Sequence, residues 1–170
     1  MLTAQKIIDL LELVPLPVEG GYFRQTYLSD ETIPADVLPA RYTCAKPYIS
    51  VIYYLLYDDF FSALHRLPTD EVYHHYLGDP VEMLLLLPGG SSEVVVLGSD
   101  LAAGQKVQFV APAGAWQGSR VLPGGKLALL GTTMSPAYTD EDFQLGIRAE
   151  LVNQYPERER LIHSLTPDSG

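Results

Sequence analysis

The feature that most constrains the fold of this chain is a series of short apolar runs, each ended by proline, glycine or aspartate. The turn residues Pro68-Thr69-Asp70 and Pro123-Gly124-Gly125 are two examples. Many short strands at such spacing are typical of a β-sandwich or barrel. The sequence therefore predicts a mainly β protein. The expected strands are residues 22–28, 48–57, 60–67, 71–77, 81–87, 93–97, 106–111, 117–122 and 126–134.

Helices are expected only at the two ends of the chain. Thr3 can cap a helix that continues to about Val14, because apolar residues recur there at helical spacing and Pro15 stops it. Residues 148–154 and a segment from Pro156 to about Leu165 are the C-terminal candidates. We expect one domain over residues 1–170, with a helix at about 3–14, a barrel at about 21–145 and helices at about 148–165. Residues 29–47 contain three prolines and are expected to form a loop.

Composition narrows the range of functions. The 170 residues carry a formal net charge of -10, and the pI is about 4.6. A nucleic-acid-binding protein usually has a basic patch, and an acidic chain is repelled by anionic membrane surfaces, so neither partner is expected. Cys44 is the only cysteine, which excludes an intrachain disulfide. The N-terminus lacks the pattern of a signal peptide, and a cytoplasmic location is expected.

The strongest candidate for chemistry is the stretch from His65 to Gly78, which holds three of the four histidines. Imidazole and carboxylate groups on neighbouring strands can bind a metal or move a proton. Strand alternation places His65 on one face with Phe61, and Glu71 on one face with Tyr73. We therefore expect His65 and Glu71 to face one pocket.

Two other residues near that pocket, His74 and Glu19, each have two possible placements. The side on which His74 lies depends on whether a β-bulge interrupts its strand. The turn containing Glu19, Gly20 and Gly21 has two interpretations, because Glu19 can either reach the barrel mouth or belong to a turn that only directs the first strand. We favour the second interpretation.

The spacing of these residues resembles the two motifs of the cupin superfamily. In the first motif, two histidines one residue apart are followed by a glutamate and a glycine, and here these positions hold His65, Leu67, Glu71 and Gly78. The second motif has Pro-x-Gly and then a histidine, and here Gln117 occupies the histidine position after Pro112-Ala113-Gly114. Two of the four usual metal-ligand positions are therefore changed.

The closer resemblance is to the small cupin 5 family of bacterial and fungal proteins. It rests on an ordered set of stretches, including VEGGYFRQTY at residues 18–27, IYYLL at 52–56, DEVYHHY at 70–76 and VAPAGAWQ at 110–117. The resemblance implies a double-stranded β-helix, or jelly roll, that usually forms a homodimer. It does not imply one activity, because cupins include metal-dependent enzymes, metal-free epimerases and binding proteins.

Three functions follow as hypotheses. The first is a metal-free sugar or nucleotide-sugar epimerase or isomerase, in which His65 is the base, Glu71 or Asp70 its partner, and Tyr76 or Tyr53 the acid. Arg24 and Arg66 can hold a phosphate or carboxylate group of the substrate.

The second hypothesis is a non-enzymatic module that binds a small molecule. The third is a metal-dependent enzyme whose divalent metal is held by His65, Glu71 and Gln117, with His74 as a further candidate ligand. Across the three hypotheses, the other candidate ligand contacts are Tyr22, Tyr53, Tyr73, His74 and Trp116. The sequence leaves these hypotheses open.

Overall fold

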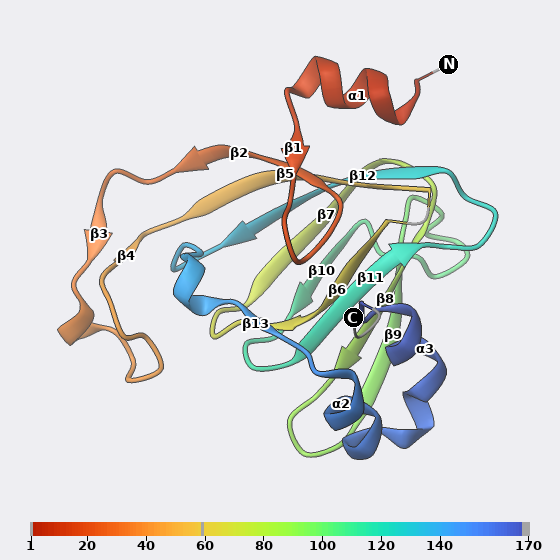
Figure 1. Cartoon of the computed structure of the whole chain (residues 1–170). Helices are drawn as coiled ribbons and strands as arrows, with labels where there is room; N and C mark the ends of the chain where they lie inside the picture. The colour runs from red at the N-terminus through yellow and green to blue at the C-terminus, as the bar shows by residue number, and fades with distance from the viewer. Residues whose placement is uncertain (1, 59, 168–170) are drawn as a thin grey trace.

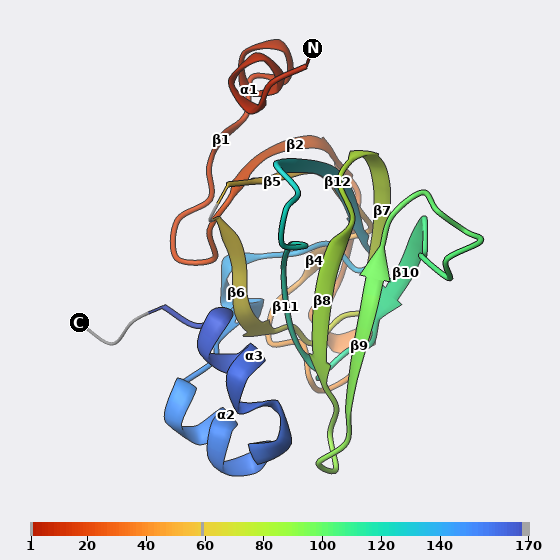
Figure 2. The ribbon, with the colours of Figure 1, turned by 90° about the vertical axis from the view of Figure 1, so that its right-hand side faces the viewer.

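The computed structural model describes residues 2–58 and 60–167, and two antiparallel β-sheets form its body. The first sheet has the order β1 (Val14–Pro15), β2 (Tyr22–Leu28), β5 (Ser50–Tyr57), β12 (Leu127–Met134), β7 (Glu71–Gly78) and β10 (Gln108–Ala111). The second has the order β13 (Gln144–Leu145), β6 (Phe61–Arg66), β11 (Trp116–Val121), β8 (Val81–Leu86) and β9 (Ser92–Leu97). The sheets face each other and form the expected jelly-roll barrel (Figures 1 and 2).

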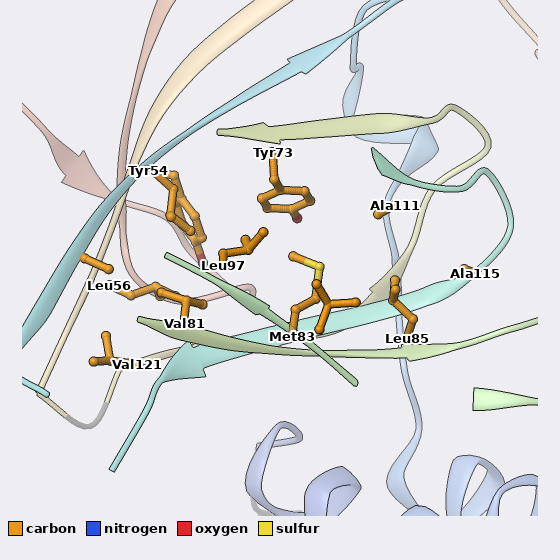
Figure 3. Close-up of a cluster of buried hydrophobic side chains, with 13 residues drawn as sticks. Tyr54, Leu56, Tyr73, Val81, Met83, Leu85, Leu97, Ala111, Ala115 and Val121 are labelled. Carbon is orange, nitrogen blue, oxygen red and sulfur yellow. The ribbon is translucent and has the colours of Figure 1, made fainter. Parts of the chain in front are cut away.

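The centre of the barrel is filled by apolar side chains from both sheets (Figure 3). Tyr54 and Tyr73 enter from the first sheet, and Met83 and Leu85 enter from the second. All four are buried, and each such side chain contributes roughly 1.5–3 kcal/mol by leaving water. This core fills one part of the barrel and leaves the rest for the cavity described below.

Helices cover the outer faces of the sheets. The N-terminal helix α1 (Ala4–Leu11) packs Ile7 against the first sheet. The C-terminal helices α2 (Arg148–Gln154) and α3 (Glu159–Ser164) pack against the second sheet (Figure 2). None of the helices in the described part of the chain has the length and apolar character needed to cross a membrane.

Helix α1 starts and ends through local hydrogen bonds. The Thr3 hydroxyl accepts the backbone N–H of Lys6 at 3.3 Å, as a cap residue does. The helix ends at Leu11, before the expected Val14, because Glu12 adopts a left-handed conformation with φ of 50°. Val14 and Pro15 then pair with β2.

The segment expected as a loop contains more structure than its sequence suggested. Within residues 29–47, β3 (Thr32–Ile33) pairs with β4 (Lys46–Pro47), and the 3₁₀ helix η1 (Ala35–Val37) lies between them. This part of the chain extends away from the barrel (Figure 1). Two further 3₁₀ helices are η2 (Asp140–Asp142) and η3 (Pro156–Arg158).

A β-bulge in β6 changes which residues face the barrel interior. The pairing between β6 and β11 shifts after His65 pairs with Gln117, so that Ser62 pairs with Ser119. Strict alternation placed Phe61 on the same face as His65, and that prediction is wrong. Phe61 instead packs beside the C-terminal helices, while His65 lines the interior.

Candidate functional site

One end of the barrel holds a cavity of about 780 Å³. Strands β2, β5, β7 and β12 form one side, and β6 with the following loop forms another. The segment of residues 138–143 closes a third side, and we call this segment the wall. The volume lies within the range of small-molecule sites. The apolar lining residues are Val14, Leu16, Phe23, Ile52, Leu67, Met134 and Phe143.

A chain of buried polar side chains lies at the inner end of this cavity. Gln117 is 3% exposed, and its Nε2 donates to Glu71 Oε2 at 2.6 Å and to His65 Nε2 at 3.2 Å. The Tyr73 hydroxyl donates to the same Glu71 oxygen at 3.1 Å. Glu71 and His65 both line the cavity and are 6% and 2% exposed. The sequence expectation that these two residues face one pocket is met.

The hydrogen bonds indicate where the protons of these buried side chains lie. His65 Nδ1 lies 2.8 Å from the carbonyl oxygen of Ala63, so we assign the ring proton to Nδ1. Nε2 then accepts the Gln117 N–H, and Glu71 accepts as an anion. Within the described chain, Gln117 Oε1 has no hydrogen-bond partner although it is buried. The Gln117 amide nitrogen therefore donates hydrogen bonds to His65 and Glu71, while the amide oxygen accepts none from the described residues.

Burial has the largest effect on the pKa values of Glu71 and Tyr73. Desolvation raises the pKa of Glu71, and the charge of Glu19 raises it further. The nearby His65 and the hydrogen bonds from Thr132 and Gln117 lower it, but burial dominates. Burial also raises the pKa of Tyr73 well above the usual value, with a further contribution from the Glu71 charge. Glu71 therefore has a greater affinity for a proton than an exposed glutamate.

The wall is held against the barrel by contacts from several elements. Phe143 stacks on His65 with ring centroids 5.2 Å apart. Lys46, from β4, is 1% exposed; its Nζ lies 2.7 Å from Asp142 Oδ1 and also donates to the Thr139 hydroxyl. Asp142 Oδ2 in turn accepts the backbone N–H of Thr139 at 3.1 Å. Lys46 thus fixes the segment that covers one side of His65.

Some predicted site residues lie in or near the cavity. Arg24 lines its mouth, where Nη1 contacts Glu12 Oε2 at 2.9 Å and the Leu11 carbonyl at 3.1 Å. Tyr73 does not line the cavity but supports Glu71 from the core (Figure 3). Asp70 caps a turn instead, since its Oδ1 accepts the Ala113 N–H at 2.7 Å.

The predicted acid Tyr76 lies outside the barrel. It is 49% exposed, stacks on His74 and meets the edge of Tyr53. The pairing of β7 with β12 shifts at Tyr76, and an added Cβ on Gly131 would come within 2.3 Å of the Tyr76 hydroxyl. The missing side chain of Gly131 therefore leaves space for Tyr76 over the first sheet. Neither Tyr76 nor Tyr53 is brought opposite His65.

Two other predicted contacts are also directed away from the cavity. Tyr22 packs with Tyr57 and Phe60 in the cluster beneath α1. Trp116 packs in the cluster that contains the C-terminal helices, and Arg66 stacks on it at 4.6 Å from the ring centroid. The aromatic ligand platform expected from the sequence is therefore not formed by these residues.

The cavity is also lined by Glu19, for which the other interpretation was favoured, and by Tyr138, which no sequence pattern marked. Glu19 lines the cavity and accepts the Ser62 hydroxyl at 2.8 Å, so the interpretation of its turn as purely structural is wrong. Tyr138 also lines the cavity, and burial, followed by the charge of Asp140, raises its pKa to about 12. The adjacent glycines gave a signal for Glu19, whereas no pattern marked the wall.

The donor set does not suit a tightly held transition metal. Residues 2–58 and 60–167 contain no group of three or more His, Cys, Asp or Glu side chains placed to hold a metal ion. His65 and Glu71 are suitable donors, but Leu67 cannot ligate, and the Gln117 amide is bound to both of them. This site therefore offers two good donors where a tightly held transition metal needs three or four.

The comparisons place the chain in a family. The family model Cupin_5, described as Cupin superfamily (DUF985), matches residues 5–146, and the chain belongs to this family. A Shewanella oneidensis protein is 32% identical, with a TM-score of 0.86 and coverage of 99% of this chain and 100% of that one. A hypothetical protein from Leishmania major is 27% identical, with a TM-score of 0.88 and coverage of 98% and 100%.

More distant structures share the fold alone. A cupin 2 domain-containing protein from Halorhodospira halophila is 11% identical, with a TM-score of 0.57 and coverage of 91% of this chain and 88% of that one. A search of curated proteins found no match. The comparisons thus give the family and the fold, and function has to be argued from the site.

Proposed function

We propose that the cavity binds a small molecule and that Glu71 moves a proton to and from a carbon atom of that molecule, as in an isomerase or epimerase. The observation that carries the proposal is the buried chain of Tyr73, Glu71, Gln117 and His65 at the inner end of an open cavity. A carboxylate whose pKa is raised by burial suits proton abstraction next to a carbonyl group.

The roles of His65 and Glu71 are exchanged relative to the sequence hypothesis. Both ring nitrogens of His65 already have partners in the protein, the Ala63 carbonyl and the Gln117 amide. Glu71 lines the cavity and has the greater proton affinity that a base needs. In this proposal Glu71 is the base, and Gln117, which is also held by His65, donates a hydrogen bond to its carboxylate.

We assign the role of the acid to Tyr138, which is the tyrosine among the described residues that line the cavity. It lines the cavity, and a pKa of about 12 keeps its hydroxyl protonated at neutral pH. A protonated hydroxyl can donate a hydrogen bond or a proton to the ligand. Tyr138 replaces Tyr76 in the proposed mechanism.

The nucleotide-sugar version of the hypothesis has less support. A diphosphate needs free cationic groups, but Arg24 is paired with Glu12, and Arg66 stacks on Trp116 away from this cavity. We therefore propose a substrate without a nucleotide, such as a small hydroxyketone or ketosugar.

Deuterium exchange tests the proposal. The protein is incubated in heavy water with hydroxyacetone, dihydroxyacetone and a 4-keto deoxysugar, and deuterium at the carbon beside the carbonyl is measured by NMR. We expect enzyme-dependent incorporation that Glu71→Gln reduces by about 100-fold or more. Tyr76→Phe is the matched control and should keep the wild-type rate, because Tyr76 lies outside the cavity. An unchanged rate in Glu71→Gln contradicts the assignment.

A non-enzymatic binding protein is the second candidate function. It is favoured by the hydrogen bonds that engage both nitrogens of His65 within the protein. This candidate predicts saturable binding of a ligand in the cavity without deuterium incorporation. The homodimer expected from the family resemblance remains a prediction, and sedimentation equilibrium tests it.

A further inference from the structure

We infer that this cavity selects ligands that carry a positive charge on an amine or a quaternary ammonium group. The inference rests on the proposed function and narrows it, because it concerns the same cavity and favours, among the small ketones proposed there, those that also carry an ammonium group. It rests on the charge of the lining, on how that charge is distributed, and on the aromatic rings beside it.

The lining is strongly acidic. Among the described residues that line it, five carry carboxylates (Glu12, Glu19, Glu71, Asp140 and Glu141), and Arg24 is the only lysine or arginine. The Arg24 guanidinium contacts Glu12 at 2.9 Å and the Leu11 carbonyl at 3.1 Å, so it offers little to a ligand. With Glu71 protonated, four carboxylates still face one arginine. A bound cation would therefore balance charge that the lining leaves uncompensated.

The neighbouring lysine makes no ion pair with these lining carboxylates, although its charge acts on Glu141. Lys46 lies close to the wall, but its ammonium group is committed to Asp142 and Thr139. Among the ion pairs of the described residues, none joins Glu19, Asp140 or Glu141 to a lysine or arginine. Glu19 is instead bonded to the neutral hydroxyl of Ser62.

The carboxylates follow the path that a ligand takes inward. Glu12, Asp140 and Glu141 are exposed at the mouth, Glu19 is half-buried, and Glu71 is buried at the inner end. A cleft lined by charges of one sign, with walls of low dielectric constant, focuses the electric field and attracts ions of the opposite sign. This arrangement favours entry of a cation and opposes entry of phosphate or carboxylate ligands.

Aromatic rings give the cavity a second means of holding a cation. Phe23, Tyr138 and Phe143 line it together with aliphatic side chains. The face of an aromatic ring attracts an ammonium group, and quaternary ammonium ions are bound in proteins by such rings. Carboxylates and aromatic rings in one cavity therefore match an ammonium group joined to a partly apolar body.

Choline and its carbon isostere test the inference. Choline, neutral 3,3-dimethylbutan-1-ol and anionic 3,3-dimethylbutanoate have similar shapes and differ in charge. Their binding to the full chain is measured by NMR titration up to ~50 mM, a range that reaches weak affinities. We expect choline to bind about tenfold or more tightly than the alcohol, with no detectable binding of the acid. Raising the salt concentration should weaken choline binding only.

Matched variants separate the local charge from the net charge. Glu19→Gln and Glu141→Gln should each weaken choline binding several-fold and leave alcohol binding unchanged. Glu93→Gln removes the same charge from an exposed residue of β9 outside the cavity and is the control. Because Glu141 is exposed, its variant remains informative if Glu19→Gln unfolds the protein.

The outcomes distinguish this inference from the proposed function. Charge selectivity is overturned if choline and the alcohol bind equally, or if choline fails to bind. In either case, deuterium exchange that depends on Glu71 still supports the proposed proton transfer. If Glu141→Gln weakens choline binding, charge selectivity is supported. If no deuterium exchange is found in the same protein, the enzymatic proposal is contradicted. An effect of Glu93→Gln as large as that of Glu141→Gln also overturns the inference, because the net charge then explains the binding.

Discussion

The buried ion pair between Lys46 and Asp142 makes a sharp prediction about stability. Lys46 is 1% exposed, the Asp142 side chain is 6% exposed, and their charged atoms are 2.7 Å apart. The substitution Lys46→Met keeps most of the apolar side chain but leaves the Asp142 carboxylate buried without its cation. Breaking a buried pair in this way costs about 3–5 kcal/mol. For a chain of this length, such a loss lowers the melting temperature by roughly 6–20 °C.

A double-mutant cycle tests the origin of this cost. Asp142→Leu leaves the lysine unpaired, whereas Lys46→Met with Asp142→Leu removes both charges and should recover most of the stability. Thermal unfolding is followed by circular dichroism and by fluorescence of Trp116, the only tryptophan. A fall in melting temperature below about 2 °C for Lys46→Met, or a double variant no better than either single one, would refute the reasoning.

Three other perturbations have defined outcomes. Burial raises the pKa of Glu71, so the native state of the wild type loses stability as the pH rises above 4.5, the usual glutamate pKa, and Glu71 ionises. Glu71→Gln should therefore be more stable than the wild type above pH 4.5 and similar to it below that pH. Urea unfolding at pH 4 and pH 8 measures the difference. Gly20→Ala should cost roughly 2–4 kcal/mol in the same assay, since φ is +102° and a Cβ would lie 2.3 Å from the Phe61 carbonyl oxygen. Leu67→His combined with Gln117→His should give a chain that retains zinc after dialysis, which elemental analysis detects, while a metal-free product would count against the cupin register.

Most of the fold could be predicted from local sequence patterns. The expected bounds of β2 and of α2 match the structure, because β2 lies between the Gly20-Gly21 turn and Ser29, and α2 lies just before Pro156. The two-residue strands β1, β3, β4 and β13 were missed. Two residues carry no periodicity, and their pairing depends on the strands that lie beside them.

The site was only partly predictable, for a different physical reason. Motif spacing placed His65, Glu71 and Gln117 together without knowledge of the turns between their strands. Alternation along β7 put Tyr76 with His74 on the face opposite Glu71, and the two rings stack there. Tyr76 and Tyr53 were assigned as the acid from the likeness to metal-free epimerases and not from the strand pattern. The wall that carries Tyr138 is held by buried ionic contacts made with a distant part of the chain, and these leave no periodic pattern in the sequence.

The amide of Gln117 also restricts how protons can be distributed at the inner end of the cavity. As assigned, one nitrogen serves two acceptors, Glu71 and His65. A half-turn of the amide would bring its oxygen to both of them, and each would then have to supply a proton. Any mixed state leaves one of the two contacts without a hydrogen bond, which is costly in a buried site. The orientation of one uncharged side chain therefore decides whether Glu71 and His65 both accept or both donate a hydrogen bond at this point.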